Sequence, residues 1–278
     1  MRQVRPAVSA PPAIRPTFSL PVFLAVALGG AWLVATPMWL AGIDVAAAGM
    51  AMMFTPAIAV LLARKRGVGV VELVRRSGLA LGQSRGRTLG VAVAILAGIP
   101  ALTALAIALA AVFGLVRLGP GDVITALATI PVGMLVLLPT AFGEEWGWRG
   151  VLVPRLAERY ANRVSLAVVS GGIWGLWHAP LGLYFGAKAP LLLIPLCAFF
   201  MVCAALLNWT RLATGSVWPA VVGHALLNAS PAAMLAAVTS TATTSLDGNG
   251  IAGMAIWMAV LAIAVLLRRT GRDVRRVS

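Results

Sequence analysis

The stretch LLPTAFGEEWGWRGVLV, residues 137–153, places two adjacent carboxylates and an arginine inside a run of apolar residues. The charged residues are Glu144, Glu145 and Arg149. Ionisable side chains are costly in hydrocarbon, so within a membrane segment they usually mark a functional site. The stretch therefore predicts a membrane helix that contributes part of such a site.

The two histidines of the chain lie in two further apolar runs. His178 belongs to GGIWGLWHAPLG, residues 171–182, and His224 belongs to AVVGHALLNAS, residues 220–230. Three separate segments thus each supply one polar cluster. This distribution predicts a site assembled from several helices within the bilayer.

The composition is that of a membrane protein. Of 278 residues, 60% are hydrophobic and 11% are charged, whereas soluble domains average about 45–50% apolar and about 25% charged residues. A spanning helix needs roughly 20 mostly apolar residues. We therefore predict an all-α, polytopic membrane helix bundle with about eight transmembrane helices. The predicted spans are 18–40, 43–63, 89–116, 123–153, 164–187, 189–209, 214–238 and 251–267.

The positive charge of the chain predicts its orientation. The net charge is +14, which in a soluble protein would suggest nucleic-acid binding. With the N-terminus inside, 19 of the 22 lysines and arginines fall on the cytoplasmic side, whereas Arg117 and Lys188 fall outside and Arg149 lies within a span. Because cytoplasmic loops are enriched in Lys and Arg, we predict an N-in, C-in cell-membrane protein with no nucleic-acid partner.

The predicted spans divide the chain into four parts. Residues 1–17 are expected to form a disordered basic cytoplasmic tail, and 18–122 the N-terminal transmembrane helices with a basic cytoplasmic loop at 64–88. Residues 123–238 hold all three polar clusters and form the predicted catalytic helices. Residues 239–278 are expected to form an external loop, a last transmembrane helix and a basic cytoplasmic tail.

Helical spacing separates the roles of the two glutamates. Glu145 and Arg149 are four residues apart and share a helix face, whereas Glu144 points about 100° away. Glu145 is therefore predicted to position Arg149, and Glu144 to face a reactant as a general base. The alternative is a structural ion pair.

The histidine segments allow two kinds of chemistry. Trp174 precedes His178 by four residues, and Asn228 follows His224 by four, so each pair shares a face. A carboxylate and a histidine can activate water, and another histidine with an asparagine can donate hydrogen bonds to an oxyanion. His178, His224 and Glu144 could instead ligate Zn²⁺, which accepts such ligands. The sequence leaves the cofactor open between Zn²⁺ and none.

Two functions without proteolysis also remain open from the residues. The chain could be a non-catalytic membrane immunity or scaffold protein. It could also be a small transporter that uses the glutamates and histidines as a proton relay. Transporters typically show repeated halves or broken helices, and the sequence shows no clear internal repeat.

The three motifs together resemble the CPBP family of intramembrane endopeptidases. This family comprises CAAX proteases and bacteriocin-processing proteins and is also called Abi or Rce1-like. The matching motifs are EExxxR at 144–149, an aromatic residue and histidine at 174 and 178, and HxxxN at 224–228. The resemblance covers roughly residues 125–235, and Trp174 stands where the family usually has Phe.

The resemblance implies a role for each motif residue. Glu144 and His178 would activate the attacking water, and His224 and Asn228 would form the oxyanion site. Glu145, Arg149 and Trp174 would support them. The family is called a metalloprotease, although the residues do not decide whether a metal takes part. The expected partners are the bilayer and a membrane-associated protein or peptide, such as a CAAX-like protein or a bacteriocin-type leader, entering from the cytosol or the inner leaflet.

Overall fold

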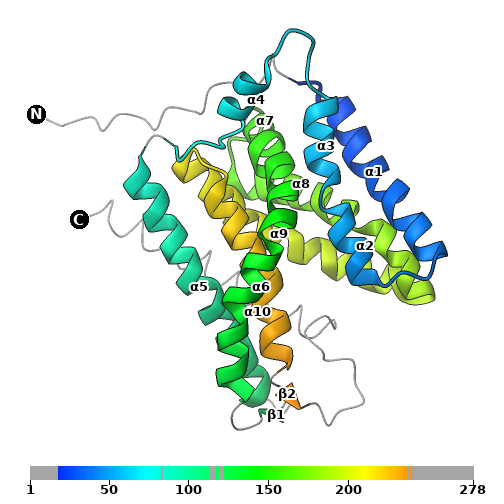
Figure 1. The fold of residues 1–278 in the computed structure, drawn as a ribbon, viewed down its shortest axis with the longest axis vertical. Helices are drawn as coiled ribbons and strands as arrows, with labels where there is room; N and C mark the ends of the chain where they lie inside the picture. Colours follow the sequence, from blue (N-terminus) through cyan, green and yellow to red (C-terminus); the bar gives the residue numbers. More distant parts are fainter. Residues whose placement is uncertain (1–17, 83, 113–116, 119–121, 237, 240–278) are drawn as a thin grey trace, which may run out of the picture.

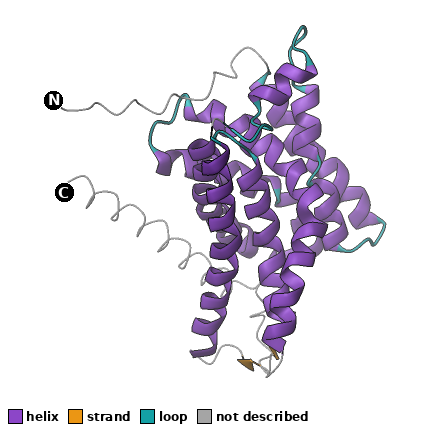
Figure 2. Cartoon of the chain, turned by 60° about the vertical axis from the view of Figure 1, so that its left-hand side comes forward, coloured by secondary structure: helices purple, strands orange, loops and turns teal. Residues whose placement is uncertain are grey.

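The computed structural model describes residues 18–82, 84–112, 117–118, 122–236 and 238–239. The predicted tail 1–17, most of the predicted external loop and the predicted last span 251–267 lie outside these residues. The described part consists of helices joined by loops, with one antiparallel pair of two-residue strands (Figure 2). The predicted all-α helix bundle is confirmed. The helices are α1 (Leu20–Leu40), α2 (Val45–Met52), α3 (Thr55–Leu62), α4 (Val70–Arg76), α5 (Arg85–Val112), α6 (Asp122–Glu145), η1 (Trp146–Leu152), α7 (Val153–Ala157), α8 (Arg163–Trp177), η2 (Ala179–Lys188), α9 (Ala189–Thr214) and α10 (Trp218–Ala236), and the strands are β1 (Arg117–Leu118) and β2 (Val238–Thr239).

Several helices are long and apolar enough to cross a membrane. Within the described residues four segments meet this criterion by length and composition, and a fifth does if α8 and η2, bent by 44°, form one span. The fourth and seventh predicted spans form α6 and α10, which carry the polar motifs and are not among the four. The count of eight spans therefore stays a prediction. The four segments are Leu20–Leu40, Val45–Leu62, Arg85–Leu105 and Cys197–Thr214.

Helix α10 lies at the centre of one half of the bundle. It packs against α6, α5 and α9, and these contacts bury Val221, Ala225 and Leu226 (Figure 1). Helix α1 pairs with α3 in the other half. The segment η1 lies between the halves because it contacts both α3 and α6. The residues that follow Glu145 are therefore held from two sides.

Glycines let α8 approach α9 closely. A Cβ atom added at Gly171 would lie 2.4 Å from the Cα of Met201, and one at Gly175 would lie 2.8 Å from the Cα of Cys197. Small residues four apart are a common way for membrane helices to pack closely. This packing fixes Trp174, which lies between the two glycines, against the centre of the bundle.

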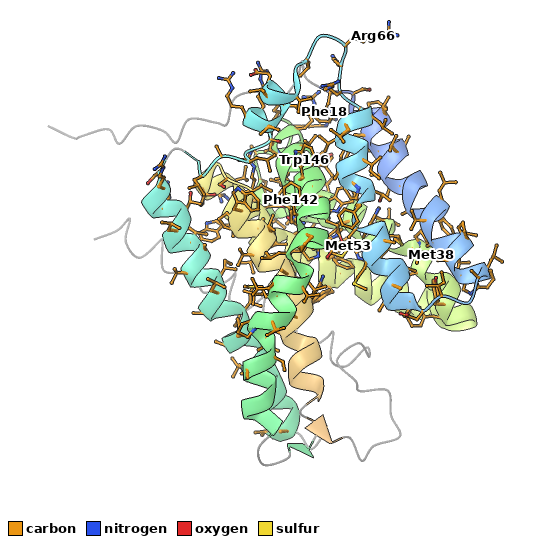
Figure 3. All side chains as sticks on the ribbon, in the orientation of Figure 1. Phe18, Met38, Met53, Arg66, Phe142 and Trp146 are labelled. Carbon is orange, nitrogen blue, oxygen red and sulfur yellow. The ribbon has the colours of Figure 1, made fainter. Side chains whose placement is uncertain are left out.

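The basic segment 64–88 caps one end of the bundle. It contains α4, where Glu72 pairs with Arg75 at 2.7 Å and also with Arg76. The hydrogen bond from Arg76, together with Arg75, holds the pKa of Glu72 below its usual range. Arg66 lies at this end (Figure 3), whereas β1 and β2 lie at the opposite end (Figure 1). We call the end that carries segment 64–88 the basic end.

Residues 77–82 bind the basic segment to the rest of the bundle. The Val217 amide donates to the Gly78 carbonyl at 2.8 Å, and the Trp218 indole donates to the Leu79 carbonyl at 2.8 Å. The Trp146 indole donates to the Ser77 hydroxyl at 2.9 Å. The start of α10 and the start of η1 are thereby fixed at the basic end.

Candidate active site

One cavity of about 240 Å³ is lined by all four residues predicted to be catalytic. Glu144 comes from the end of α6, His178 caps the C-terminus of α8, and His224 and Asn228 come from α10. Three helices that are distant in sequence thus converge on one space. The other lining residues are Ala46, Gly49, Met50, Met53, Leu137, Trp177, Leu181, Phe199 and Phe200.

The Glu144 carboxylate is buried and held by two indoles. Its side chain accepts hydrogen bonds at Oε2 from Trp148 Nε1 at 3.1 Å and from Trp174 Nε1 at 2.6 Å. Its Oε1 lies 3.9 Å from His224 Nε2. The indoles therefore fix the orientation of the carboxylate, while Oε1 remains directed toward a histidine at a distance too long for a direct hydrogen bond.

Glu145 joins an arginine to a histidine. Its Oε1 accepts from Arg149 Nη1 at 2.7 Å and from His224 Nδ1 at 2.8 Å. The structure thus contains the pair of Glu145 and Arg149 that helical spacing predicted. The contact between Glu145 and His224 was not predicted. A carboxylate that binds one imidazole nitrogen fixes the orientation of the ring. Glu145 therefore positions His224 as well as Arg149.

Arg149 is surrounded by groups that hold its guanidinium in place. Besides Glu145, its Nε donates to Asn208 Oδ1 at 3.3 Å, and its guanidinium carbon lies 4.2 Å from the centre of the Trp174 ring. Asn208 in turn donates to Ser170 Oγ at 2.8 Å. These contacts link η1 to α8 and α9, so three elements determine where Glu145 lies.

The helix widens immediately after the two glutamates. Residues Trp146–Leu152 form a π-helix, in which hydrogen bonds run from residue i to i+5 and which often occurs at functional sites. The carbonyl of Arg149 accepts a hydrogen bond from Arg211 Nε at 3.0 Å. Arg211 is almost fully buried, and its side chain links α9 to η1 inside the bundle.

His178 has a defined tautomer in this arrangement. Its Nδ1 lies 2.9 Å from the Trp174 carbonyl oxygen, which can only accept, so Nδ1 carries the hydrogen. The ring stacks on Phe200 with centroids 4.1 Å apart. A neutral His178 thus keeps a lone pair on Nε2. Among the described residues, His224 is the histidine nearest to Glu144, with Nε2 3.9 Å from Oε1. His178 lines the same cavity as Glu144.

Two buried arginines accompany the two buried glutamates. Arg149 pairs with Glu145 at 2.7 Å, and Arg211 binds the carbonyl of Arg149. His224 lies between the two carboxylates, 2.8 Å from Glu145 Oε1 and 3.9 Å from Glu144 Oε1.

The geometry does not group three metal ligands. Within the part of the chain that the structure describes, no three His, Cys, Asp or Glu side chains lie so that they could hold a metal ion. The donors of Glu144, His178 and His224 therefore do not fit the three-ligand zinc site that the sequence allowed.

Comparison with known proteins identifies the helices that form this site. The profile of the type II CAAX prenyl endopeptidase Rce1-like family matches residues 126–230. The chain carries an Rce1-like domain. No curated protein matches the chain. The family is embedded in membranes and is a protease family, so the suspected CAAX-protease relationship and the membrane location are confirmed.

The Rce1-like domain contains every residue of the polar cluster. It begins within α6 and ends near Ser230 in α10, and it includes η1, α8 and α9. Helices α1 to α5 lie outside it, although α2 supplies one wall of the cavity through Ala46, Gly49 and Met50. The cavity is therefore lined both by the matched segment and by residues that lie outside it.

Three residues that contact the polar cluster escaped the sequence analysis. Trp148 is four residues after Glu144, and this helical spacing could have revealed it. Asn208 and Arg211 bind Arg149 from another helix. Asn208 is a polar residue in an apolar run, which is a weak signal, and Arg211 resembled an ordinary cytoplasmic charge at the end of a span.

Proposed function

We propose that the chain is an intramembrane endopeptidase that hydrolyses peptide bonds in membrane-associated substrates. The observation that carries this proposal is the convergence of Glu144, His178, His224 and Asn228 on one cavity. A carboxylate, two imidazoles and a carboxamide are the groups that a hydrolysis without a covalent nucleophile requires. The Rce1-like match supports the same reaction class.

Glu144 is the proposed general base. Its Oε2 is occupied by two indoles, so Oε1 is the atom that accepts a proton from water. His178 contributes the Nε2 lone pair as a second acceptor that orients the same water. Burial excludes bulk solvent around the pair, which strengthens each electrostatic interaction. Proton transfer by a positioned base typically contributes about 10²–10⁴ in rate.

His224 and Asn228 are the proposed donors to the oxyanion of the tetrahedral intermediate. His224 Nδ1 donates to the Glu145 carboxylate, so donation through Nε2 requires the imidazolium form. In that form His224 makes an ion pair with Glu145, whose Oε1 lies 2.8 Å from Nδ1. Asn228, one turn along α10, supplies an amide N–H. Losing one such donor typically costs about 10²–10³ in kcat.

The proposed substrates are CAAX-like proteins or bacteriocin-type leader peptides. The family description names CAAX prenyl endopeptidases, and the walls of the cavity are largely apolar. No step of the proposed mechanism uses a metal, because the described donors do not fit a three-ligand site.

A comparison of membrane proteomes tests the proposal. Membranes from cells that express the wild-type chain or Glu144→Gln are compared by quantitative N-terminal and C-terminal peptide sequencing. We expect at least one membrane-associated protein to be cut only with the wild type. Glu72→Gln is the matched control, because it removes a carboxylate on the exposed α4 and should leave cleavage intact.

The same experiment distinguishes the alternatives. Identical proteomes for wild type and Glu144→Gln, with both proteins folded and equally abundant, would contradict the protease and favour a scaffold or immunity protein. A phenotype that depends on Glu144 and on the proton gradient without any cleavage would favour a transporter.

A further inference from the structure

The carbonyl oxygen of Arg149 lacks a hydrogen-bond donor within its own helix. In an α-helix its donor would be the N–H of Val153, and in a π-helix, where bonds run from residue i to i+5, it would be the N–H of residue 154. The Val153 N–H donates instead to the Trp148 carbonyl, which is the π-helical pattern. Residue 154 is a proline, which has no N–H. The sequence of η1 therefore leaves one backbone acceptor that the helix itself cannot satisfy.

Arg211 donates to this carbonyl from another helix. Its Nε lies 3.0 Å from the Arg149 carbonyl oxygen, and the side chain, in the last turn of α9, is 1% exposed. A buried backbone acceptor without a donor is costly. In an α-helical pattern the missing N–H of Pro154 would leave the Gly150 carbonyl free instead. Arg211 thus lies at the acceptor that the π-helical pattern leaves free.

The basic segment holds the Arg211 guanidinium against η1. Gly78 packs on it so closely that an added Cβ would lie 2.7 Å from Arg211 Cζ. The Gly78 carbonyl accepts from the Val217 N–H at 2.8 Å, and the Gly215 N–H donates to the Arg211 carbonyl at 2.9 Å. The guanidinium is therefore confined between segment 77–82 and the backbone of η1.

The carbonyl that Arg211 binds belongs to the residue that holds Glu145. Arg149 Nη1 donates to Glu145 Oε1 at 2.7 Å, and the preceding residue, Trp148, donates to Glu144 Oε2 at 3.1 Å. A bond that fixes the backbone at Arg149 therefore also fixes where these two donors lie relative to the glutamates. Arg211 is not one of the described residues that line the cavity. Its effect on the site therefore passes through η1.

We propose that Arg211 is a positioning residue of the active site. It supplies the hydrogen bond that Pro154 cannot give to η1, and it thereby holds Trp148 and Arg149 against the two glutamates. The proposal rests on the proposed peptidase function only for its effect on turnover, because the contacts exist without substrate. It gives Arg211 a function inside the bundle, whereas the sequence alone groups this residue with the cytoplasmic charges.

Two substitutions separate the hydrogen bond from the rest of the side chain. Gln has an N–H donor at the position of the arginine Nε, whereas Met has a methyl group there. Arg211→Gln should keep the bond to the Arg149 carbonyl, and Arg211→Met should lose it. In a double variant that combines Arg211→Met with Pro154→Ala, the new N–H of residue 154 can donate to the same carbonyl. Arg159→Met is the control, because Arg159 is exposed.

Indole N–H signals report the position of η1 without any substrate. The tryptophans are labelled with ¹⁵N, NMR spectra are recorded in detergent, and the signals of Trp148 and Trp174 are identified with Trp148→Phe and Trp174→Phe. We expect Arg211→Met to shift the Trp148 signal, because η1 loosens. The double variant should return this signal toward its wild-type position, and Arg211→Gln and Arg159→Met should leave it there.

Turnover of an identified substrate gives the second measurement. Arg211→Met should lower kcat by about tenfold or more, because displacing a group near the chemistry by about 1 Å can cost about 10²-fold. KM should stay nearly unchanged, since Arg211 does not line the cavity. Arg211→Gln and the double variant should recover most of the lost kcat. A merely structural role would reduce the amount of folded protein and leave kcat of the folded fraction unchanged.

A wild-type Trp148 signal in Arg211→Met would overturn the proposal, and so would a double variant that remains shifted or does not fold. If Arg211→Met alone does not fold, the double variant still decides, because its restored N–H should allow folding. Signals that behave as expected in a chain that cuts nothing would keep the positioning role and contradict the protease. Cleavage that depends on Glu144, with signals that Arg211→Met leaves unaltered, would do the opposite.

Discussion

At the scale of single residues, Glu144 and Glu145 are adjacent in sequence and differ in environment. Glu144 is held by two neutral indole donors and faces the cavity. Glu145 is held by Arg149 and His224. This division gives each glutamate a distinct expected phenotype.

Glu144→Gln is expected to lose cleavage and keep its stability. The amide oxygen of glutamine can accept from Trp148 and Trp174, so the packing survives, but the side chain no longer accepts a proton from water. Removing a general base should lower kcat by about 10²–10⁴. Turnover of an identified substrate and the melting temperature are measured in the same detergent. Retained turnover would remove Glu144 from the role of base.

Glu145→Gln is expected to lose stability and part of its activity. The change leaves the buried Arg149 without its charged partner, and breaking one side of a buried pair costs roughly 3–5 kcal/mol. Because Glu145 also orients His224, kcat should fall, though less than in Glu144→Gln. Chemical or thermal unfolding alongside kinetics checks both effects. A stable but inactive Glu145→Gln, with an active Glu144→Gln, would reverse the two assignments.

Removal of metal is expected to leave activity unchanged. Within the described residues, no three His, Cys, Asp or Glu side chains lie so that they could hold a metal ion. The purified chain is treated with a strong chelator, its metal content is measured, and turnover is compared before and after. Activity lost with one equivalent of zinc and restored by zinc would show that a metal takes part.

At the scale of elements, the position of the site depends on the close contact of η1 with α3. Gly147 has no side chain, and an added Cβ would overlap Pro56 at 2.4 Å. Gly147→Ala should therefore push the two elements apart and destabilise the fold by about 1–3 kcal/mol, as overpacking does. Unfolding in detergent measures this cost.

Gly98→Ala is the matched control for this change. It lies within α5 with nothing within 4 Å of an added Cβ, and alanine favours helix over glycine by about 0.8–1 kcal/mol. We expect Gly98→Ala to be neutral or slightly stabilising. Equal effects of the two substitutions would contradict a specific contact between η1 and α3.

The sequence predicted local features of these elements better than their contacts. Helical spacing predicted the pair of Glu145 and Arg149, and the long apolar runs predicted the helices. It did not predict the π-helix after Glu145, where Arg211 binds the Arg149 carbonyl and η1 packs against α3. Nor did it give the bond between Glu145 and His224, which joins residues 79 positions apart. Such contacts depend on how helices cross, which residue spacing within one helix does not encode.

At the scale of the whole molecule, the charge distribution predicts how the bundle lies in the membrane. The basic segment 64–88 and the start of α10 share one end, and β1 and β2 lie at the other (Figure 1). Because Lys and Arg favour the cytoplasmic side, we expect that end and both termini to be cytoplasmic and residues 239–250 to be external.

Reporter fusions test the orientation directly. A reporter active only in the cytoplasm is fused after Ser278, and a reporter active only outside the cell is inserted within 239–250. Both reporters should be active. When the two reporters are exchanged between these positions, both should be silent. The physical reason is the predicted division of 19 Lys and Arg residues inside against two outside. As a control, substituting Arg64, Lys65 and Arg66 by Gln should weaken the asymmetry and raise the inverted fraction. An external reporter at Ser278 in the wild-type chain would overturn the topology.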